Sequence, residues 1–256
     1  MNHEVNTRTN TVRRQSGFTL IELLLAMTFI SVLLLTIALT IVQIANIYNR
    51  GIILKEMNQT SRSLSDELDD AMRGSSTFSI DPAAQRYVSN EWGGRMCLAQ
   101  YSYIWNYGTA LDSVSSNRNL YLDGAASGNG VFNAAGDLQR YDISFVKAPD
   151  AGGSYCIADS EGVYPSVSPA GAVELLRSGD HSLAIHSMSI VSSSTSEDAL
   201  SSQRLYKVAF TLGTNRLTAM TSDQSACKPP SEDGSDLNYC AVQQFTLVIR
   251  VVSGVN

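Results

Sequence analysis

The stretch GFTLIELLLAMTFISVLLLTIALTIV, residues 17–42, is almost entirely apolar and contains one ionisable residue, Glu22. As a helix, the segment from Phe18 to Val42 would extend about 37 Å, which is longer than a hydrocarbon core of about 30 Å. The apolar run therefore predicts a helix that spans a membrane. Everything before it is short, and everything after it is long enough for a separate domain.

Charge is distributed unevenly around this span. Residues 1–17 contain Arg8, Arg13 and Arg14 against a single acidic residue, Glu4, whereas the rest of the chain has 15 basic and 23 acidic residues. Because cytoplasmic flanks of membrane spans are rich in Lys and Arg, we expect the N-terminus in the cytoplasm and the residues after the span outside. The net negative charge of the residues after the span does not favour DNA binding. A local basic patch would still allow it.

The junction at the start of the span differs from an ordinary secretory signal. The apolar run is about twice too long for such a signal, and cleavage after it is not expected. The residues RRQSGFTLIELLLAM instead resemble the prepilin signature of type IV pilins and type II secretion pseudopilins, with Gly17, Phe18 and Glu22 in the order that this family shows. The resemblance implies that a prepilin peptidase cuts after Gly17 and methylates Phe18.

Glu22 has two interpretations. A carboxylate deep in hydrocarbon costs about 2.5–3.5 kcal/mol, and Glu22 lies close enough to the start of the helix to reach the interface. The resemblance implies a different role, in which Glu22 pairs with the N-terminal ammonium of a neighbouring Phe18 as subunits enter a fibre, so that each charge offsets the desolvation of the other. The surrounding signature favours this assembly role.

Beyond the span the apolar residues recur on one side of a helix. This pattern predicts that the helix continues to about Arg73, ends at Gly74 and packs one face against a sheet. A coiled coil over residues 47–72 is the alternative, weakened by the polar residue in its seam. The inward residues are expected to be Leu54, Met57, Ser61, Leu64, Leu68 and Met72.

Residues 75–256 are rich in alternating apolar segments, which predict half-buried antiparallel strands. One short helical segment is expected at 172–177. The predicted fold class is therefore α+β, a pilin-like lollipop with a long helix packed on an antiparallel sheet. Its expected parts are a basic leader (1–17), a membrane and assembly helix (18–47), an amphipathic helix half (48–74) and a β-rich exterior domain (75–256). The expected strands lie near 97–108, 119–122, 141–145, 183–188, 206–212 and 245–251.

All four cysteines follow the span, which places them in the compartment where disulfides form. Four cysteines allow three connectivities, and we expect neighbours in sequence to pair. The rival interpretation is a zinc site, but there is no CxxC pair and the histidines lie elsewhere in the sequence. The expected pairs are Cys97 with Cys156, and Cys227 with Cys240.

The sequence gives no sign of enzyme chemistry. No nucleophile, base and orienting group occur in a recognisable pattern, and we expect no catalytic residue, no metal site and no cofactor. His181 and His186 are interpreted as surface histidines, and the serine cluster at 192–196 as a solvated loop. The alternating aromatic residues Tyr101, Tyr103, Trp105 and Tyr107 favour the packed face of a strand over a ligand platform.

The expected function follows from the signature and the size of the product. Cleavage after Gly17 would leave 239 residues with no proline between Phe18 and Arg73, features that resemble larger minor pilins. We expect a minor subunit of a surface fibre serving adhesion, motility or DNA uptake, anchored in the cytoplasmic membrane before assembly. Its expected partners are other pilin subunits, the prepilin peptidase and methylase, and an inner-membrane assembly platform. The alternatives are a minor pseudopilin of a secretion system and a membrane-anchored extracellular binding domain.

Overall fold

The computed structural model describes residues 17–89, 93–112, 131–132, 138–139, 143–160, 164–165, 167–168, 170–177, 183–192 and 203–252. The chain divides into two compact units, Met1–Asn46 and Ile47–Asn256, which are described separately below. The strand predicted at 119–122, His181 and residues 193–196 of the serine cluster lie outside the described residues.

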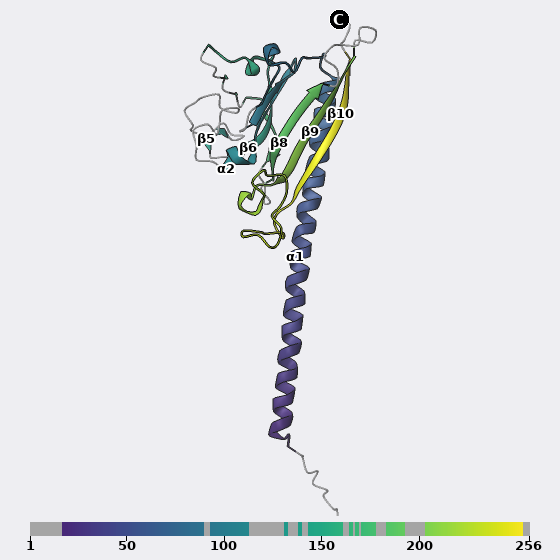
Figure 1. Ribbon diagram of the computed structural model, residues 1–256, viewed down its shortest axis with the longest axis vertical. Helices are drawn as coiled ribbons and strands as arrows, with labels where there is room; N and C mark the ends of the chain where they lie inside the picture. The colour runs from purple at the N-terminus through teal and green to yellow at the C-terminus, as the bar shows by residue number, and fades with distance from the viewer. Residues whose placement is uncertain are drawn as a thin grey trace, which may run out of the picture. The chain divides into compact units, whose positions relative to one another are not determined.

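The first unit contains the beginning of α1 (Leu20–Arg73), the long helix in Figure 1. Its side chains from Leu20 to Ala45 are exposed in the isolated chain. Among the described residues, α1 is the one helix that is long and apolar enough to cross a membrane. The predicted end of the helix at Arg73 is confirmed, and its first helical residue is Leu20 rather than Phe18.

In the second unit, α1 buries one stripe of side chains. The predicted stripe is confirmed except at its first member, because Ile53 is buried and Leu54 is 37% exposed. Ile53 continues the four-residue spacing of Met57 and Ser61, whereas Leu54 lies at the edge of the stripe. The buried residues of α1 are Ile53, Met57, Ser61, Leu64, Leu68 and Met72.

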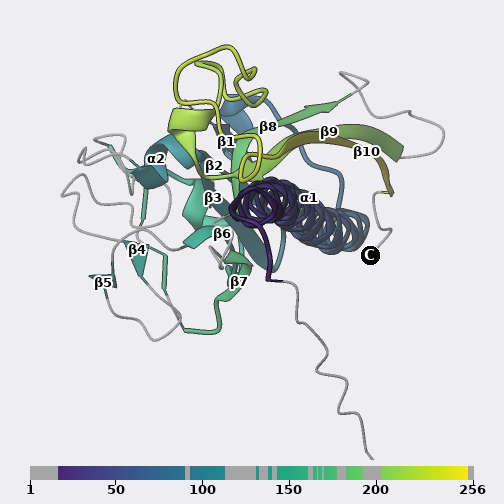
Figure 2. The same cartoon turned by 90° about the horizontal axis from the view of Figure 1, so that it is seen from below.

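Two antiparallel sheets pack against the buried stripe of α1. The long helix and these sheets confirm the predicted α+β class. Viewed nearly along α1, the strands of both sheets lie on one side of the helix (Figure 2). The five-stranded sheet has the order β1-β2-β3-β6-β7, with β1 (Tyr87–Ser89), β2 (Gly93–Cys97), β3 (Tyr101–Asn106), β6 (Ile143–Pro149) and β7 (Val173–Arg177). The three-stranded sheet has the order β10-β9-β8, with β8 (Leu183–Ser192), β9 (Gln203–Thr214) and β10 (Val242–Val252).

Shorter elements complete the described structure. A two-stranded sheet pairs β4 with β5, and one helix, α2, follows β3. In the connections that the structure describes, there are three single-turn 3-10 helices. The bounds of these elements are β4 (Val131–Phe132), β5 (Leu138–Gln139), α2 (Gly108–Asp112), η1 (Pro82–Ala84), η3 (Ser154–Cys156) and η4 (Leu217–Ala219).

Trp105 fills the core between the five-stranded sheet and α1. Its ring packs edge-on against Phe145 and stacks with Tyr87. The neighbouring strand β2 makes room for it with a glycine, because a Cβ on Gly94 would lie 2.4 Å from the indole ring. The aromatic alternation in β3 therefore serves packing at Trp105, as the sequence predicted.

The three-stranded sheet contains an irregularity that also marks its sequence. The register of β8 against β9 shifts between Ile185 and Ser187, as in a β-bulge. The extra residue breaks the period of two, so that Ile185 and Met188 are both buried although three positions separate them. This bulge explains why the apolar alternation of residues 183–188 is imperfect.

One secondary-structure prediction is wrong. The segment predicted as a short helix at 172–177 is strand β7, and Lys147 of β6 lies opposite Val173 of β7. The sequence VELLR is compatible with either structure by local propensity, and pairing with the edge of β6 decides for the strand.

Candidate processing and assembly site

The first turn of α1 is closed by reciprocal hydrogen bonds between Thr19 and Glu22. The backbone N–H of Glu22 donates to Oγ1 of Thr19 over 3.3 Å, and the backbone N–H of Thr19 donates to Oε2 of Glu22 over 3.2 Å. The Thr19 hydroxyl also donates to the same carboxylate oxygen over 3.0 Å. This arrangement is a capping box, which satisfies backbone donors that the first turn of a helix leaves unpaired.

The capping role of Thr19 was not predicted from the sequence. The signal was present in the spacing, because Thr-x-x-Glu immediately before an apolar run is the pattern of a capping box. The cap explains why the helix begins at Leu20, one residue after Thr19. It also gives Glu22 a partner within its own chain.

The hydroxyl groups of the apolar segment are likewise satisfied internally. Thr28, Ser31, Thr36 and Thr40 each donate to a backbone carbonyl three or four residues earlier, over 2.8–2.9 Å. A polar group in hydrocarbon is costly unless it is hydrogen-bonded, and these contacts remove that cost. Glu22 is left as the single ionisable side chain between Phe18 and Val42.

Gly17 and Phe18 lie just before the capped turn. Phe18 is highly exposed, and a Cβ placed on Gly17 would meet no atom within 4 Å. The packing of this chain therefore does not require glycine at position 17. Nothing in the described residues tests cleavage after Gly17 or methylation of Phe18, and both stay predictions.

The cysteines form two disulfides in the second unit. Cys97 of β2 is bonded to Cys156 of η3, and Cys227 is bonded to Cys240. The first bond is fully buried, and the second lies beside a small cluster formed by Ala219 and Met220. Both bonds join cysteines that are neighbours in sequence.

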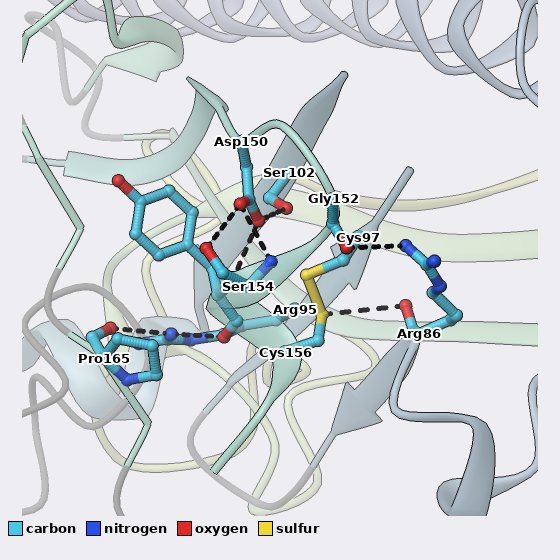
Figure 3. Close-up of a disulfide and its surroundings, with 10 residues drawn as sticks. Arg86, Arg95, Cys97, Ser102, Asp150, Gly152, Ser154, Cys156 and Pro165 are labelled. Carbon is cyan, nitrogen blue, oxygen red and sulfur yellow. Dashed lines mark hydrogen bonds between the residues drawn. A yellow bond between two sulfur atoms is a disulfide. The ribbon is translucent and has the colours of Figure 1, made fainter. Parts of the chain in front are cut away.

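A hydrogen-bonded turn holds the loop at the Cys97–Cys156 disulfide (Figure 3). Asp150 accepts hydrogen bonds from the Ser102 hydroxyl over 2.6 Å, from the Ser154 hydroxyl over 2.6 Å and from the Tyr155 backbone N–H over 2.9 Å. Burial alone would raise the pKa of Asp150, but these donors outweigh it and hold the pKa below its usual value. The carboxylate is thus a structural group that shapes the loop.

Arg95 fixes the same loop from the core of the five-stranded sheet. Its side chain is buried, and Nη1 donates to the backbone carbonyls of Tyr155 over 2.6 Å and Pro165 over 2.9 Å (Figure 3). A buried arginine is rare unless it is paired, so sequence reasoning did not single it out. Together with the disulfide, it attaches the exterior loop to β2.

The histidine and metal predictions have different outcomes. His186 is buried at 8% exposure, so its interpretation as a surface residue is wrong. It occupies the bulge in β8, its Nδ1 lies 2.9 Å from Oε1 of Gln224, and burial lowers its pKa. Among the residues that the structure describes, no cluster of three metal-ligating side chains occurs.

The fold and the capped junction define a class of protein, one with an exposed apolar N-terminal helix that continues into a disulfide-bonded antiparallel-sheet domain. Residues 12–42 match the family model for the prokaryotic N-terminal methylation motif. This chain carries that motif, which is the signature of type IV pilins and pseudopilins. No curated protein and no solved structure gave a significant match.

The motif has consequences for assembly, processing and location at the level of the family. It implies assembly with other pilin subunits and processing by a prepilin peptidase. Together with the apolar helix, it fits anchoring in a membrane and a place in a surface fibre. Gly17, Phe18 and Glu22 all lie within the matched residues.

Proposed function

We propose that this chain is a minor subunit of a type IV pilus-like surface fibre that serves adhesion, motility or DNA uptake. In this proposal the leader is removed after Gly17, Phe18 is methylated and the subunit waits in the cytoplasmic membrane with its sheet domain outside. An assembly platform in that membrane then transfers it to the fibre. The chain acts by assembly and catalyses no reaction of its own.

The observation that carries the proposal is the methylation motif at residues 12–42, which includes the start of the exposed apolar helix. Gly17 supports cleavage, because the folded chain itself makes no steric demand for glycine there. A peptidase that must bind the backbone closely supplies such a demand. The size of the sheet domain and the absence of proline from the helix support a minor rather than a major subunit.

Processing is tested by mass spectrometry of the N-terminus of the protein isolated from membranes. The proposal predicts a chain that begins at Phe18 and carries one methyl group on its amino nitrogen. Gly17→Ala tests the demand for glycine, because it leaves the fold undisturbed and is expected to prevent cleavage. A mature chain that begins at Met1, or after the span, would refute the processing step.

Assembly is tested at Glu22 with a pair of variants that separate charge from helix capping. Glu22→Gln keeps a side chain that can complete the capping box but removes the charge. Thr19→Ala removes the capping hydroxyl but keeps the charge. We expect both variants to be inserted and cut, Glu22→Gln to enter sheared fibres poorly, and Thr19→Ala to enter them better than Glu22→Gln.

The opposite order of incorporation would show that Glu22 serves its own helix and would remove the proposed pairing with a neighbouring Phe18. Fibres sheared from the cell surface also distinguish the leading proposal from a minor pseudopilin. The chain is expected in those fibres, and its confinement to the cell envelope together with a secretion defect on deletion would favour the pseudopilin.

A further inference from the structure

The row of alternating aromatic residues that begins in β3 and ends just after it does not have one role throughout. Tyr103, Trp105 and Tyr107 are buried, as a packed strand requires, but Tyr101 is 41% exposed. Tyr101 lies at the start of the strand, on the rim of a cleft of about 410 Å³ between the end of α1 and the five-stranded sheet. Core packing explains three of the four rings, whereas the fourth remains partly exposed to solvent.

One wall of the cleft consists of Glu67, Tyr103 and Lys147, and the last two are both hydrogen-bonded to Glu67. Oε1 of Glu67 on α1 accepts hydrogen bonds from the Tyr103 hydroxyl over 2.6 Å and from Nζ of Lys147 over 2.7 Å. The same Lys147 ammonium lies 4.4 Å from the centroid of the Tyr101 ring, a cation–π distance. The wall is thus held by contacts from both the helix and the sheet.

Hydrogen bonding also fixes the charge states in the wall. Burial alone would raise the pKa of Glu67, but the bonds from Lys147 and Tyr103 outweigh it and lower the pKa below its usual value. Burial, reinforced by Glu67, raises the pKa of Tyr103. At neutral pH Glu67 is therefore a carboxylate and Tyr103 a neutral phenol, and Asp70 and Gln100 lie on the rim of the cleft.

This set of groups excludes ligands of strong charge. An anion would face Glu67 and Asp70, and a cation would face Lys147 beside its ion pair. A neutral ligand with many hydroxyl groups fits better, because the wall and the rim provide both donors and acceptors. The exposed part of the Tyr101 ring is an apolar surface of the kind that the C–H face of a sugar requires.

A second cavity of about 330 Å³ adjoins the first and shares Ser75, Leu98 and Ala99 with it. Its other lining residues include Ser76 and Thr77 from the turn after α1. A peptide that binds by adding a strand needs an unpaired strand edge, whereas β3 is paired on both sides, with β2 and with β6. The two cavities therefore suit an oligosaccharide better than a peptide.

We infer that the cleft between the end of α1 and β3 binds a neutral oligosaccharide, with Tyr101 as its stacking platform and Asp70 and Gln100 as hydrogen-bonding groups on the rim. The inference rests on the proposed function only in that the fibre would expose this cleft at the cell surface. Binding by a single subunit is measured without a fibre, so failure of this inference leaves the proposed function standing, and the reverse also holds.

The test uses the full-length protein in lipid nanodiscs and four immobilised probes. These are neutral trisaccharides of hexose, neutral trisaccharides of N-acetylhexosamine, their sulfated counterparts, and an uncharged extended peptide. We expect a neutral trisaccharide to bind and Tyr101→Ala to weaken that binding at least tenfold. Tyr101→Phe keeps the ring and is expected to retain most of the affinity.

Tyr239 provides a matched control. It is 40% exposed and has its own cation–π neighbour, with Cζ of Arg216 lying 4.9 Å from the ring centroid, but it is outside the cleft. Tyr239→Ala is therefore expected to leave saccharide binding unchanged. Because Tyr101→Ala removes a partner of Lys147, its thermal unfolding is compared with that of the wild-type protein.

Asp70→Ala is a second variant that keeps the test decisive if Tyr101→Ala unfolds. Asp70 is exposed on α1, where alanine is a better helix former, so the fold is expected to tolerate this change. We expect a several-fold loss of saccharide affinity. The inference is overturned if no neutral trisaccharide binds, if only the peptide or the sulfated probes bind, or if the folded variants of Tyr101 and Asp70 bind as well as the wild type.

Discussion

Removal of the two disulfides, one at a time, is expected to destabilise the sheet domain to different extents. Cys97 and Cys156 are 59 residues apart, and Cys227 and Cys240 are 13 apart. The loop-closure entropy that a crosslink removes from the unfolded chain corresponds to about 4 kcal/mol for the first loop and about 3 kcal/mol for the second. A typical domain is stable by only about 5–15 kcal/mol, so either loss is measurable.

The positions of the bonds increase this difference. The Cys97–Cys156 bond is buried, and it joins β2 of the five-stranded sheet to the loop that is held by hydrogen bonds to Asp150. The Cys227–Cys240 bond lies beside a small satellite cluster, where local opening is possible without loss of the main core. We therefore expect the full effect from the first bond and a partly local effect from the second.

The assay is urea unfolding of the double variants Cys97→Ala/Cys156→Ala and Cys227→Ala/Cys240→Ala in nanodiscs, followed by tryptophan fluorescence. Trp105 is buried in the core at the five-stranded sheet, so its fluorescence reports the unfolding of that sheet. Each variant keeps the other disulfide, which serves as its control. A larger loss of unfolding free energy from the 227/240 variant, or no loss from the 97/156 variant, would refute the reasoning.

Three further changes test the packing of α1. Gly51→Ala is expected to stabilise the helix by about 1 kcal/mol, because an added Cβ meets no atom within 4 Å, and thermal unfolding measures the gain. Leu68→Ala opens a cavity in the fully buried stripe and should lower the free energy of unfolding by about 2–5 kcal/mol in urea titrations. The pKa of Glu67 is lowered in the folded state, so its contribution is present above the unfolded pKa and is lost as the pH falls through the folded pKa. Urea midpoints measured from pH 7 down to pH 3 should therefore fall more for the wild type than for Glu67→Gln, and equal slopes would contradict this assignment.

Features that depend on local pattern could be predicted from the sequence. The stripe from Met57 to Met72 follows from the helical period alone, and Gly74 marks the end of α1 because its backbone N–H caps the carbonyl of Asp70. The methylation motif is equally local, since it occupies one continuous segment, residues 12–42. No knowledge of the tertiary fold is needed for any of these.

Features that depend on distant partners could not be predicted in this way. Residues 173–177 form a strand because β6, about 25 residues earlier in the chain, has a strand edge with which they pair. His186 is buried because a bulge in β8 brings it to Gln224, which follows β9. Arg95 is buried because carbonyls from a loop about 60 residues away receive its guanidinium group.

The contact of Glu22 with Thr19 and its proposed pairing with a neighbouring Phe18 can be compared in energy. A helix cap contributes about 1 kcal/mol, whereas an unpaired carboxylate in the bilayer centre costs about 2.5–3.5 kcal/mol. The bonds to Thr19 therefore reduce the cost of Glu22 in a membrane without removing it. A neighbouring N-terminal ammonium would supply the remainder through a charge-assisted contact, and would be desolvated at the same time. This difference in energy favours exchange of the contact with Thr19 for a contact with another subunit. Loss of the charge at Glu22 should therefore reduce incorporation into fibres more than loss of the hydroxyl at Thr19.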